Sequence, residues 1–138
     1  MRKQARESVF KILYSNIFNG EPDKDFRFFV YQDDKLNETD IDFAEELYSA
    51  IINNISVINE DITSLSRGYK LERIYSTDKC AMQIAICEMR YFKDVPYIVA
   101  INEAMELVRR YSTAESPNFV NGILAEFKKR LEAEVWLF

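Results

Sequence analysis

The sequence predicts an all-α fold, and its composition and hydrophobic spacing are the observations that predict it. Apolar residues make up 48% of the 138 positions, and only three Gly and three Pro interrupt them. A chain of this length can bury roughly 65–70% of its unfolded surface in one core. Apolar residues recur at i, i+3, i+4 and i+7 through most of the chain, so we expect about seven helices joined by short loops. One domain, spanning residues 1–138, is the expected organisation.

The first helix is predicted from a stripe that contains Ala5, Val9, Leu13 and Ile17. It should end near Asn19-Gly20, because glycine accepts the backbone conformation that stops a helix. Residues 21–37 contain a cluster of aromatic residues between two loop signals. This cluster fits either a short helix or a strand, and we favour the helix.

Asn37 is a suitable N-cap for the next helix, with Leu36 and Ile41 spaced as a hydrophobic staple. The apolar stripe that follows predicts one long helix running to about Asn59. A shorter helix should then pass through Ile62 and Leu65 before Arg67-Gly68 breaks the chain.

The second half of the chain predicts three helices. Ser76 or Thr77 should cap a helix that is apolar almost all round, which is typical of a central, buried helix. Pro96 should lie in the first turn of the next helix. Ser116 should cap the last one, with Pro117 at its first position.

Charge is unevenly distributed along the chain. The net charge is −5, yet residues 1–11 hold four cations against Glu7 alone, a local charge of +3 that leaves −8 for the remainder. A basic tip on an acidic body attracts a polyanion at one place and opposes nonspecific nucleic-acid binding elsewhere.

No apolar run approaches the roughly 20 residues of a membrane span, and the N-terminus has no signal-peptide pattern, so a cytoplasmic protein is expected. Cys80 and Cys87 fall in one predicted helix, about 10 Å apart along its axis, too far for a disulfide. Reduced, partly buried thiols are therefore expected.

The residues for common catalytic and metal sites are missing from the sequence. It contains no histidine, which removes the commonest general base and transition-metal ligand. The two cysteines have no zinc spacing, and the three glycines are too far apart for a phosphate loop. We therefore expect no enzymatic activity, no metal and no cofactor.

Three segments carry motifs of a known family. Residues 2–7 form a basic start that runs into Leu13-Tyr14-Ser15. Residues 78–89 and 95–107 follow, and the latter contain Pro-x-x-Val-Ala-Ile-Asn-Glu-Ala. Residues 119–124 begin with Phe-Val-Asn-Gly. At this separation the chain resembles the NusB family of bacterial transcription antitermination factors over nearly its whole length, least over residues 20–40.

The resemblance implies a fold of two small helical bundles packed across one another. It also implies a partnership with NusE, a ribosomal small-subunit protein that doubles as a transcription factor. In that family the pair binds boxA-type single-stranded RNA and helps the RNA polymerase antitermination complex read through terminators, chiefly in ribosomal RNA operons. The expected role is thus that of an RNA-binding adaptor.

Site residues follow from the same resemblance. Arg2, Lys3 and Arg6 match basic positions of the family motif and would meet RNA phosphates and bases, and Tyr14 would stack on a base. Phe119 would line the same surface. Each residue also has a purely structural alternative. The cations could simply be solvated in the first turn of the helix, Tyr14 could lie at the edge of the core, and Phe119 could pack in the core.

Glu88 lies in an otherwise apolar helix, where an unpaired buried carboxylate would cost several kcal/mol, so it needs a partner. The resemblance places this helix beside the NusE interface, so Glu88 could accept hydrogen bonds from NusE. The alternative is an internal partner such as Arg90 or a backbone amide.

Four positions depart from the family pattern: Gln4, Gln83, Cys87 and Ala125. A competing function remains, that of a NusB-like protein-docking module without RNA recognition, like the helical domain of RNA cytosine methyltransferases. The apolar tail formed by residues 135–138 either marks an interaction surface or folds back on the core. It leaves monomer and homodimer equally open.

Overall fold

The computed structural model describes residues 1–20, 23–66, 68 and 70–137, with side chains described as far as residue 134. Within these ranges the chain forms helices and no strand, so the all-α prediction is confirmed. The elements are α1 (Arg2–Asn19), α2 (Lys24–Asp33), α3 (Glu38–Asn53), α4 (Ile55–Leu65), the 3-10 turn η1 (Leu71–Arg73), α5 (Ser76–Tyr91), α6 (Tyr97–Tyr111) and α7 (Ser116–Leu137).

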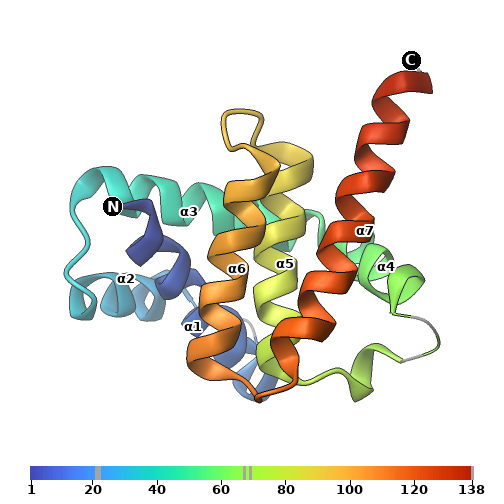
Figure 1. Ribbon diagram of the computed structural model, residues 1–138. Helices are drawn as coiled ribbons and strands as arrows, with labels where there is room; N and C mark the ends of the chain where they lie inside the picture. The colour runs from blue at the N-terminus through green and yellow to red at the C-terminus, as the bar shows by residue number, and fades with distance from the viewer. Residues whose placement is uncertain (21–22, 67, 69, 138) are drawn as a thin grey trace.

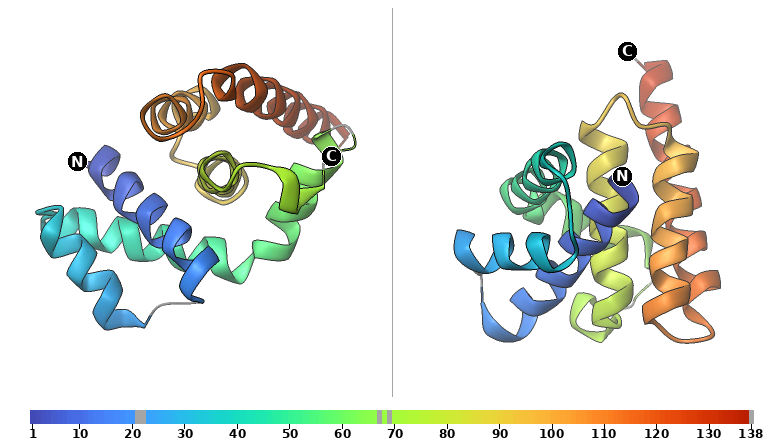
Figure 2. Two further views of the ribbon diagram at one scale, coloured as in Figure 1. Left: turned by 90° about the horizontal axis from the view of Figure 1, so that it is seen from below. Right: turned by 90° about the vertical axis from the view of Figure 1, so that its left-hand side faces the viewer.

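Helix α5 lies at the centre of the molecule and packs against α1, α3, α4, α6 and α7 (Figure 1). Its residues are buried almost without a break from Cys80 to Met89. Seen from below, α1, α2 and α3 group on one side of α5, while α6 and α7 group on the other (Figure 2). This arrangement agrees with the expected pair of helical bundles, which share one hydrophobic core.

The N-terminal elements form as the sequence predicts. Helix α1 ends at Asn19, where Gly20 adopts φ 75° and its amide donates to the Asn16 carbonyl. The segment after it is a helix, α2, and the Asp23 carboxylate caps it by accepting from the Phe26 amide at 2.9 Å. Asn37 caps α3 by accepting from the Asp40 amide at 2.9 Å.

The predicted long helix to Asn59 is wrong, because the chain breaks at Asn54. Asn54 has φ −121° and ψ 20°, and its side-chain amide donates to the Ala50 carbonyl at 2.8 Å. Asparagine competes in this way with the helical hydrogen bonds, so α3 stops at Asn53 and α4 begins at Ile55. The break turns α4 away from α3, and α4 packs against α5 and α7.

Three helix starts differ slightly from prediction. Neither Ser76 nor Thr77 caps α5, whose N-cap is Tyr75 without a side-chain hydrogen bond. The Thr77 hydroxyl is instead 2.8 Å from that of Ser112. Pro96 directly precedes α6 rather than lying within it. Helix α7 already includes Ser116, whose amide donates to the Thr113 hydroxyl at 3.2 Å.

The core encloses both cysteines as free thiols. Burial raises the pKa of Cys80 and of Cys87 to about 12, so both stay protonated and unreactive at neutral pH. None of the helices in the described ranges is long and apolar enough to cross a membrane. Whether the apolar tail of residues 135–138 forms an interaction surface or packs on the core depends on side chains that lie outside the described residues.

Candidate nucleic-acid interface

Arg2 and Lys3 lie in the first turn of α1, and the side chain of each is 47% exposed. Both cations have intramolecular partners. Arg2 is 3.0 Å from the carboxylate of Asp94, which follows α5, and its guanidinium lies 4.4 Å from the centre of the Phe43 ring. Lys3 pairs with Glu106 of α6, and this bond raises the pKa of Lys3 and lowers that of Glu106.

Arg6 behaves differently from the two cations before it. Its side chain is 6% exposed and donates two hydrogen bonds to Glu88, from Nε to Oε1 at 2.6 Å and from Nη2 to Oε2 at 2.9 Å. The predicted contact of Arg6 with RNA therefore does not agree with this structure. The guanidinium is buried between α1 and α5 and its fork is already occupied.

The predicted contact of Glu88 with a partner protein does not agree with this structure either. Glu88 is fully buried, and both of its oxygens accept from Arg6. Burial raises the pKa of Glu88 more than the Arg6 guanidinium lowers it. The internal alternative holds, but the partner is Arg6 rather than Arg90, which instead donates to Asp61 of α4 at 2.7 Å.

Sequence reasoning missed the Arg6–Glu88 pair although both residues gave a signal. Arg6 falls between Ala5 and Val9, which belong to the buried stripe of α1, and Glu88 is an acid within the apolar stretch of the central helix. Each is a lone charge on an apolar face, and such charges are rarely buried unless they are paired. Their separation of 82 residues hid the pairing.

Tyr14 lies two-thirds of the way along α1 and is 38% exposed. Its ring is 5.1 Å from that of Phe18 and borders an open pocket of about 330 Å³. The pocket lies between α1, the start of α5 and the end of α6. Its lining residues are Phe10, Lys11, Tyr14, Thr77 and Tyr111.

One stripe of α1 connects Lys3 to Tyr14. Lys3, Glu7, Phe10 and Tyr14 are spaced to share a helix face, and that face follows α6. Glu7 pairs with Arg110 and accepts from the Tyr111 hydroxyl at 3.1 Å, while the Phe10 and Tyr111 rings stack 5.0 Å apart. We call this line of residues 3, 7, 10, 14, 106, 110 and 111 the α1–α6 seam. Lys3 and Tyr14 lie about 16 Å apart along it at 1.5 Å per residue.

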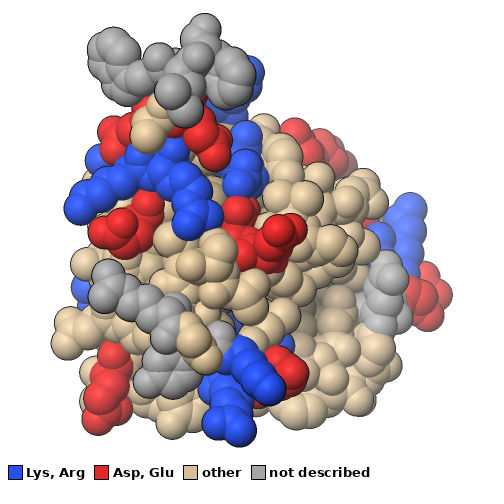
Figure 3. All heavy atoms as spheres, turned by 90° about the vertical axis from the view of Figure 1, so that its right-hand side faces the viewer, with Lys and Arg blue, Asp and Glu red and all other residues tan. Residues whose placement is uncertain are grey.

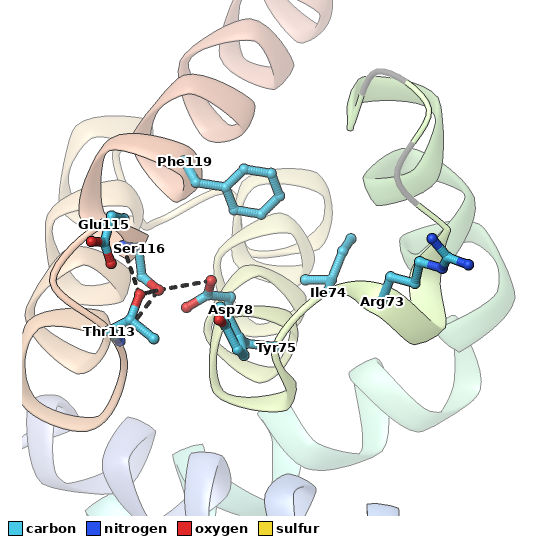
Figure 4. Close-up of a pocket in the computed structure, with 8 residues that line it drawn as sticks. All are labelled: Arg73, Ile74, Tyr75, Asp78, Thr113, Glu115, Ser116 and Phe119. Carbon is cyan, nitrogen blue, oxygen red and sulfur yellow. Dashed lines mark hydrogen bonds between the residues drawn. The ribbon is translucent and has the colours of Figure 1, made fainter.

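Phe119 is partly buried near the start of α7 and packs against the core. It lines a second pocket, of about 200 Å³, at the same end of α5 as the Tyr14 pocket (Figure 4). Thr77 borders the Tyr14 pocket and its neighbour Asp78 borders the Phe119 pocket. The structure thus brings Tyr14 and Phe119 to the same end of the molecule, and it places Arg2 and Lys3 at the other end of the seam.

The face formed by the C-terminal part of α7 carries cations too, but they lie among acidic side chains (Figure 3). Lys128 pairs with Glu132 and Lys129 with Glu126. Of the departures from the family pattern, Gln83 and Cys87 are buried and Gln4 is exposed. The Gln83 amide donates to Asn59 at 2.9 Å, so this position joins α5 to α4.

No group of three or more His, Cys, Asp or Glu side chains in the described part of the chain is arranged to hold a metal ion. The fold and the seam together define a small all-helical protein that presents cations and aromatic rings along one line of its surface. The chain belongs to the NusB family, whose model matches residues 3–129.

Similar proteins cover the chain almost completely. The transcription antitermination protein NusB of Finegoldia magna is 38% identical over 133 residues, which is 95% of this chain and 96% of that protein. The protein of the same name from Alkaliphilus oremlandii is 35% identical over 91% of each chain.

Solved structures agree on the fold. NusB of T. maritima superposes with a TM-score of 0.84 at 29% identity, covering 94% of this chain and 91% of its own. A chain from a crystal structure of antitermination factors NusB and NusE in complex with dsRNA also gives 0.84, at 22% identity, over 94% of this chain and 96% of that one. At that identity the likeness supports the fold alone.

Proposed function

We propose that this chain is a transcription antitermination factor, a noncatalytic adaptor that binds boxA-type single-stranded RNA together with NusE. The observation that carries the proposal is the match to the Finegoldia magna antitermination protein, at 38% identity over nearly the full length of both chains. The adaptor would help RNA polymerase read through terminators, chiefly in ribosomal RNA operons.

The α1–α6 seam supports the RNA-binding part of the proposal. Lys3 of the seam and its neighbour Arg2 are half-exposed cations that can reach phosphate oxygens, and Tyr14 offers an exposed ring about 16 Å from Lys3 along the helix. Cations that follow the backbone and rings on which bases stack are the usual components of single-strand recognition. Phe119 would continue the same surface beyond Tyr14.

The charge of the chain explains why a partner would be needed. The N-terminal tip carries a local charge of +3, and the rest of the chain carries a charge of −8. Binding of RNA by the protein alone should be weak, because few phosphates are neutralised, and for the same reason its salt dependence should be shallow. NusE would add contacts that this surface lacks.

Binding of a labelled boxA-type RNA, with and without NusE and against a scrambled RNA at two salt concentrations, tests the proposal. Tighter, sequence-dependent binding in the presence of NusE is the expected result. Equal binding of both RNAs under every condition would reject RNA recognition and leave the protein-docking module as the better account.

A charge-reversal variant separates these two functions. Arg2→Glu with Lys3→Glu should abolish RNA discrimination while NusE binding persists. Arg6 is left unchanged, because its buried bond to Glu88 makes it part of the core. The control is Lys128→Glu with Lys129→Glu on α7, which changes the net charge equally and should leave RNA binding largely unaffected.

A further inference from the structure

The Phe119 pocket combines a polar wall with aromatic side chains. It lies between η1, the start of α5 and the start of α7. Its lining includes Arg73, Tyr75, Asp78, Glu115 and Phe119, and its volume is about 200 Å³. Figure 4 shows the Phe119 ring extending from α7 toward Ile74, with Asp78 and the hydroxyls of Thr113 and Ser116 along another side.

Asp78 is the fixed polar group of this pocket. It is 2% exposed, and its two oxygens accept from Ser112 at 2.6 Å and from Ser116 at 2.9 Å. The hydroxyls of Thr77 and Thr113 complete the network by bonding to Ser112 and Ser116. A carboxylate has more acceptor positions than these two bonds occupy, so it can accept a further hydrogen bond. The network holds the carboxylate in place at the wall of the pocket.

Tyr75 supplies an aromatic ring that the core does not use. It precedes α5 and is 62% exposed, although it lines the pocket. The neighbouring Arg73 is also exposed, and it points away from Asp78 (Figure 4). An exposed ring beside an open pocket is a surface on which a planar ligand can stack.

The charges of the pocket decide which part of an RNA could enter. Asp78 and Glu115 both line it. Two carboxylates repel a phosphate, so the backbone must stay outside, where Arg73 can meet it. A base is neutral and planar, and it fits a pocket with an aromatic wall and fixed acceptors.

We propose that the Phe119 pocket binds a single RNA base that carries an exocyclic amino group, with Tyr75 stacking on the base and Asp78 accepting from its N–H group. The inference rests on the proposed function, whose site it extends beyond Tyr14. Carboxylates only accept hydrogen bonds, so adenine, cytosine or guanine can satisfy Asp78 through an amino group. Uracil has no such group, and its one donor on that edge, N3–H, lies between two carbonyl oxygens that would face the same carboxylate.

The experiment uses the full chain with NusE and a boxA-type RNA at one stated salt concentration. Fluorescence anisotropy gives the affinity for the intact RNA, for RNAs with one abasic position each, and for RNAs with one amino-deleted base each. Inosine, purine riboside and zebularine replace guanosine, adenosine and cytidine. Each RNA is tested on the wild-type protein, on Tyr75→Ala and on the control Tyr91→Ala, which removes an exposed tyrosine from the opposite end of α5.

Tyr75→Ala should weaken binding of the intact RNA about tenfold, the effect of losing one stacked base. At one position of the RNA, both the abasic and the amino-deleted substitution should lower the affinity of the wild-type protein. At that same position, Tyr75→Ala should bind the abasic RNA as tightly as it binds the intact RNA. Tyr91→Ala should behave as wild type throughout.

The inference is overturned if the losses from Tyr75→Ala and from abasic substitution add at every position, or if removal of the amino group at the coupled position has no effect. It is equally overturned if Tyr75→Ala and Tyr91→Ala bind alike. These failures differ from failure of the proposed function, in which the wild-type protein itself does not prefer the boxA-type RNA to a scrambled one. Circular dichroism and the melting temperature verify that both variants are folded.

Discussion

The bond between Arg6 and Glu88 makes a sharp prediction about single and paired substitutions. Removing one partner of a buried ion pair leaves the other charge without compensation, at a cost of about 3–5 kcal/mol. Arg6→Met and Glu88→Met should each lower the free energy of unfolding by about that amount. The double variant should regain most of the loss, because two apolar side chains of similar size need no partner. Urea unfolding at pH 7 measures all three.

A surface pair gives the comparison. Lys128 and Glu132 are half-exposed one helical turn apart on α7, and such pairs contribute at most about 0.5 kcal/mol. Lys128→Met should therefore change the free energy of unfolding only slightly. If the Arg6 and Glu88 losses simply add in the double variant, the two side chains are not a coupled unit.

The intramolecular partner of Lys3 should compete with RNA. A phosphate that binds Lys3 must displace Glu106, to which the ammonium is already bonded. Glu106→Gln should therefore raise the affinity for RNA by about two- to fivefold, in line with the small energies of exposed pairs. Filter binding or anisotropy at low salt measures the change.

Two controls test whether the gain passes through Lys3. Glu132→Gln removes the same charge from an α7 pair and should leave the RNA affinity unchanged. In a Lys3→Met background, Glu106→Gln should also have little effect. A full gain in that background would mean that Glu106 acts by repelling RNA at long range.

At the residue scale, the sequence could identify chemistry but not pairing. Arg2, Lys3 and Tyr14 are surface residues, as the motif suggested, because helix periodicity already turns them outward. Whether the Arg6 side chain is exposed depends on the crossing angle between α1 and α5. That angle cannot be predicted from the local sequence pattern. In the Asp78 network, the hydroxyls of Ser112 and Ser116 are separated from Asp78 by 34 and 38 positions in the sequence, so local patterns could not predict these bonds.

Substitution to alanine should have opposite effects on stability at two glycines, one at the end of a helix and one within a helix. Gly20 ends α1 at φ 75°, a backbone conformation that is unfavourable for any residue with a side chain. Gly20→Ala should therefore destabilise the protein by about 1 kcal/mol. Gly122 lies within α7, and an added Cβ there meets nothing within 4 Å. Gly122→Ala should stabilise the protein by about 0.5–1 kcal/mol. Thermal and urea unfolding check both, and a destabilised Gly122→Ala protein would reveal a requirement that the helix itself does not impose.

The docking of α2 on α3 should depend on pH through Glu45. This carboxylate accepts from Arg27 at 2.9 Å and from the Tyr31 hydroxyl at 2.6 Å, and the Arg27 bond lowers its pKa below 4.5. Its stabilising effect is therefore present above the unfolded pKa and is lost as the pH falls through the folded one.

Glu45→Gln should thus reduce the free energy of unfolding at pH 7 by about 1 kcal/mol or less, given the partial exposure of the pair. The difference from wild type should shrink below about pH 4.5. Urea unfolding at pH 7, 5 and 3.5 gives the curve, with Glu46→Gln, an exposed neighbour, as the control. A constant difference across this range would contradict the role of the Glu45 charge.

The sequence predicted the existence of elements better than their ends. Asn37 and Gly20 mark boundaries with local chemistry, and both were placed correctly. Asn54 offers the same chemistry, but the apolar stripe continues past it through Ile55 and Ile58, so periodicity argued for one helix. The break is decided by packing, because α4 must leave α3 to reach α5 and α7.

The distribution of charge over the whole molecule limits how RNA can bind. Arg2 and Lys3 are the most exposed side-chain cations of the basic tip, at 47% each, while Lys11 is 39% exposed and Arg6 is buried. The acidic remainder repels the rest of the strand. The molecule should therefore bind RNA through few phosphates and depend on base contacts for much of its affinity.

This limit predicts a shallow salt dependence. Each phosphate neutralised on a single strand contributes about −0.7 to the slope of log K against log salt, so two contacts give about −1.4. Lys3→Met should reduce the magnitude of the slope by about 0.7, whereas Lys128→Met should leave it unchanged. Titrations of the chain alone across several salt concentrations measure the slope. A slope steeper than about −3, or one unaffected by Lys3→Met, would place the phosphate contacts elsewhere on the surface, because the basic tip does not expose that many cations.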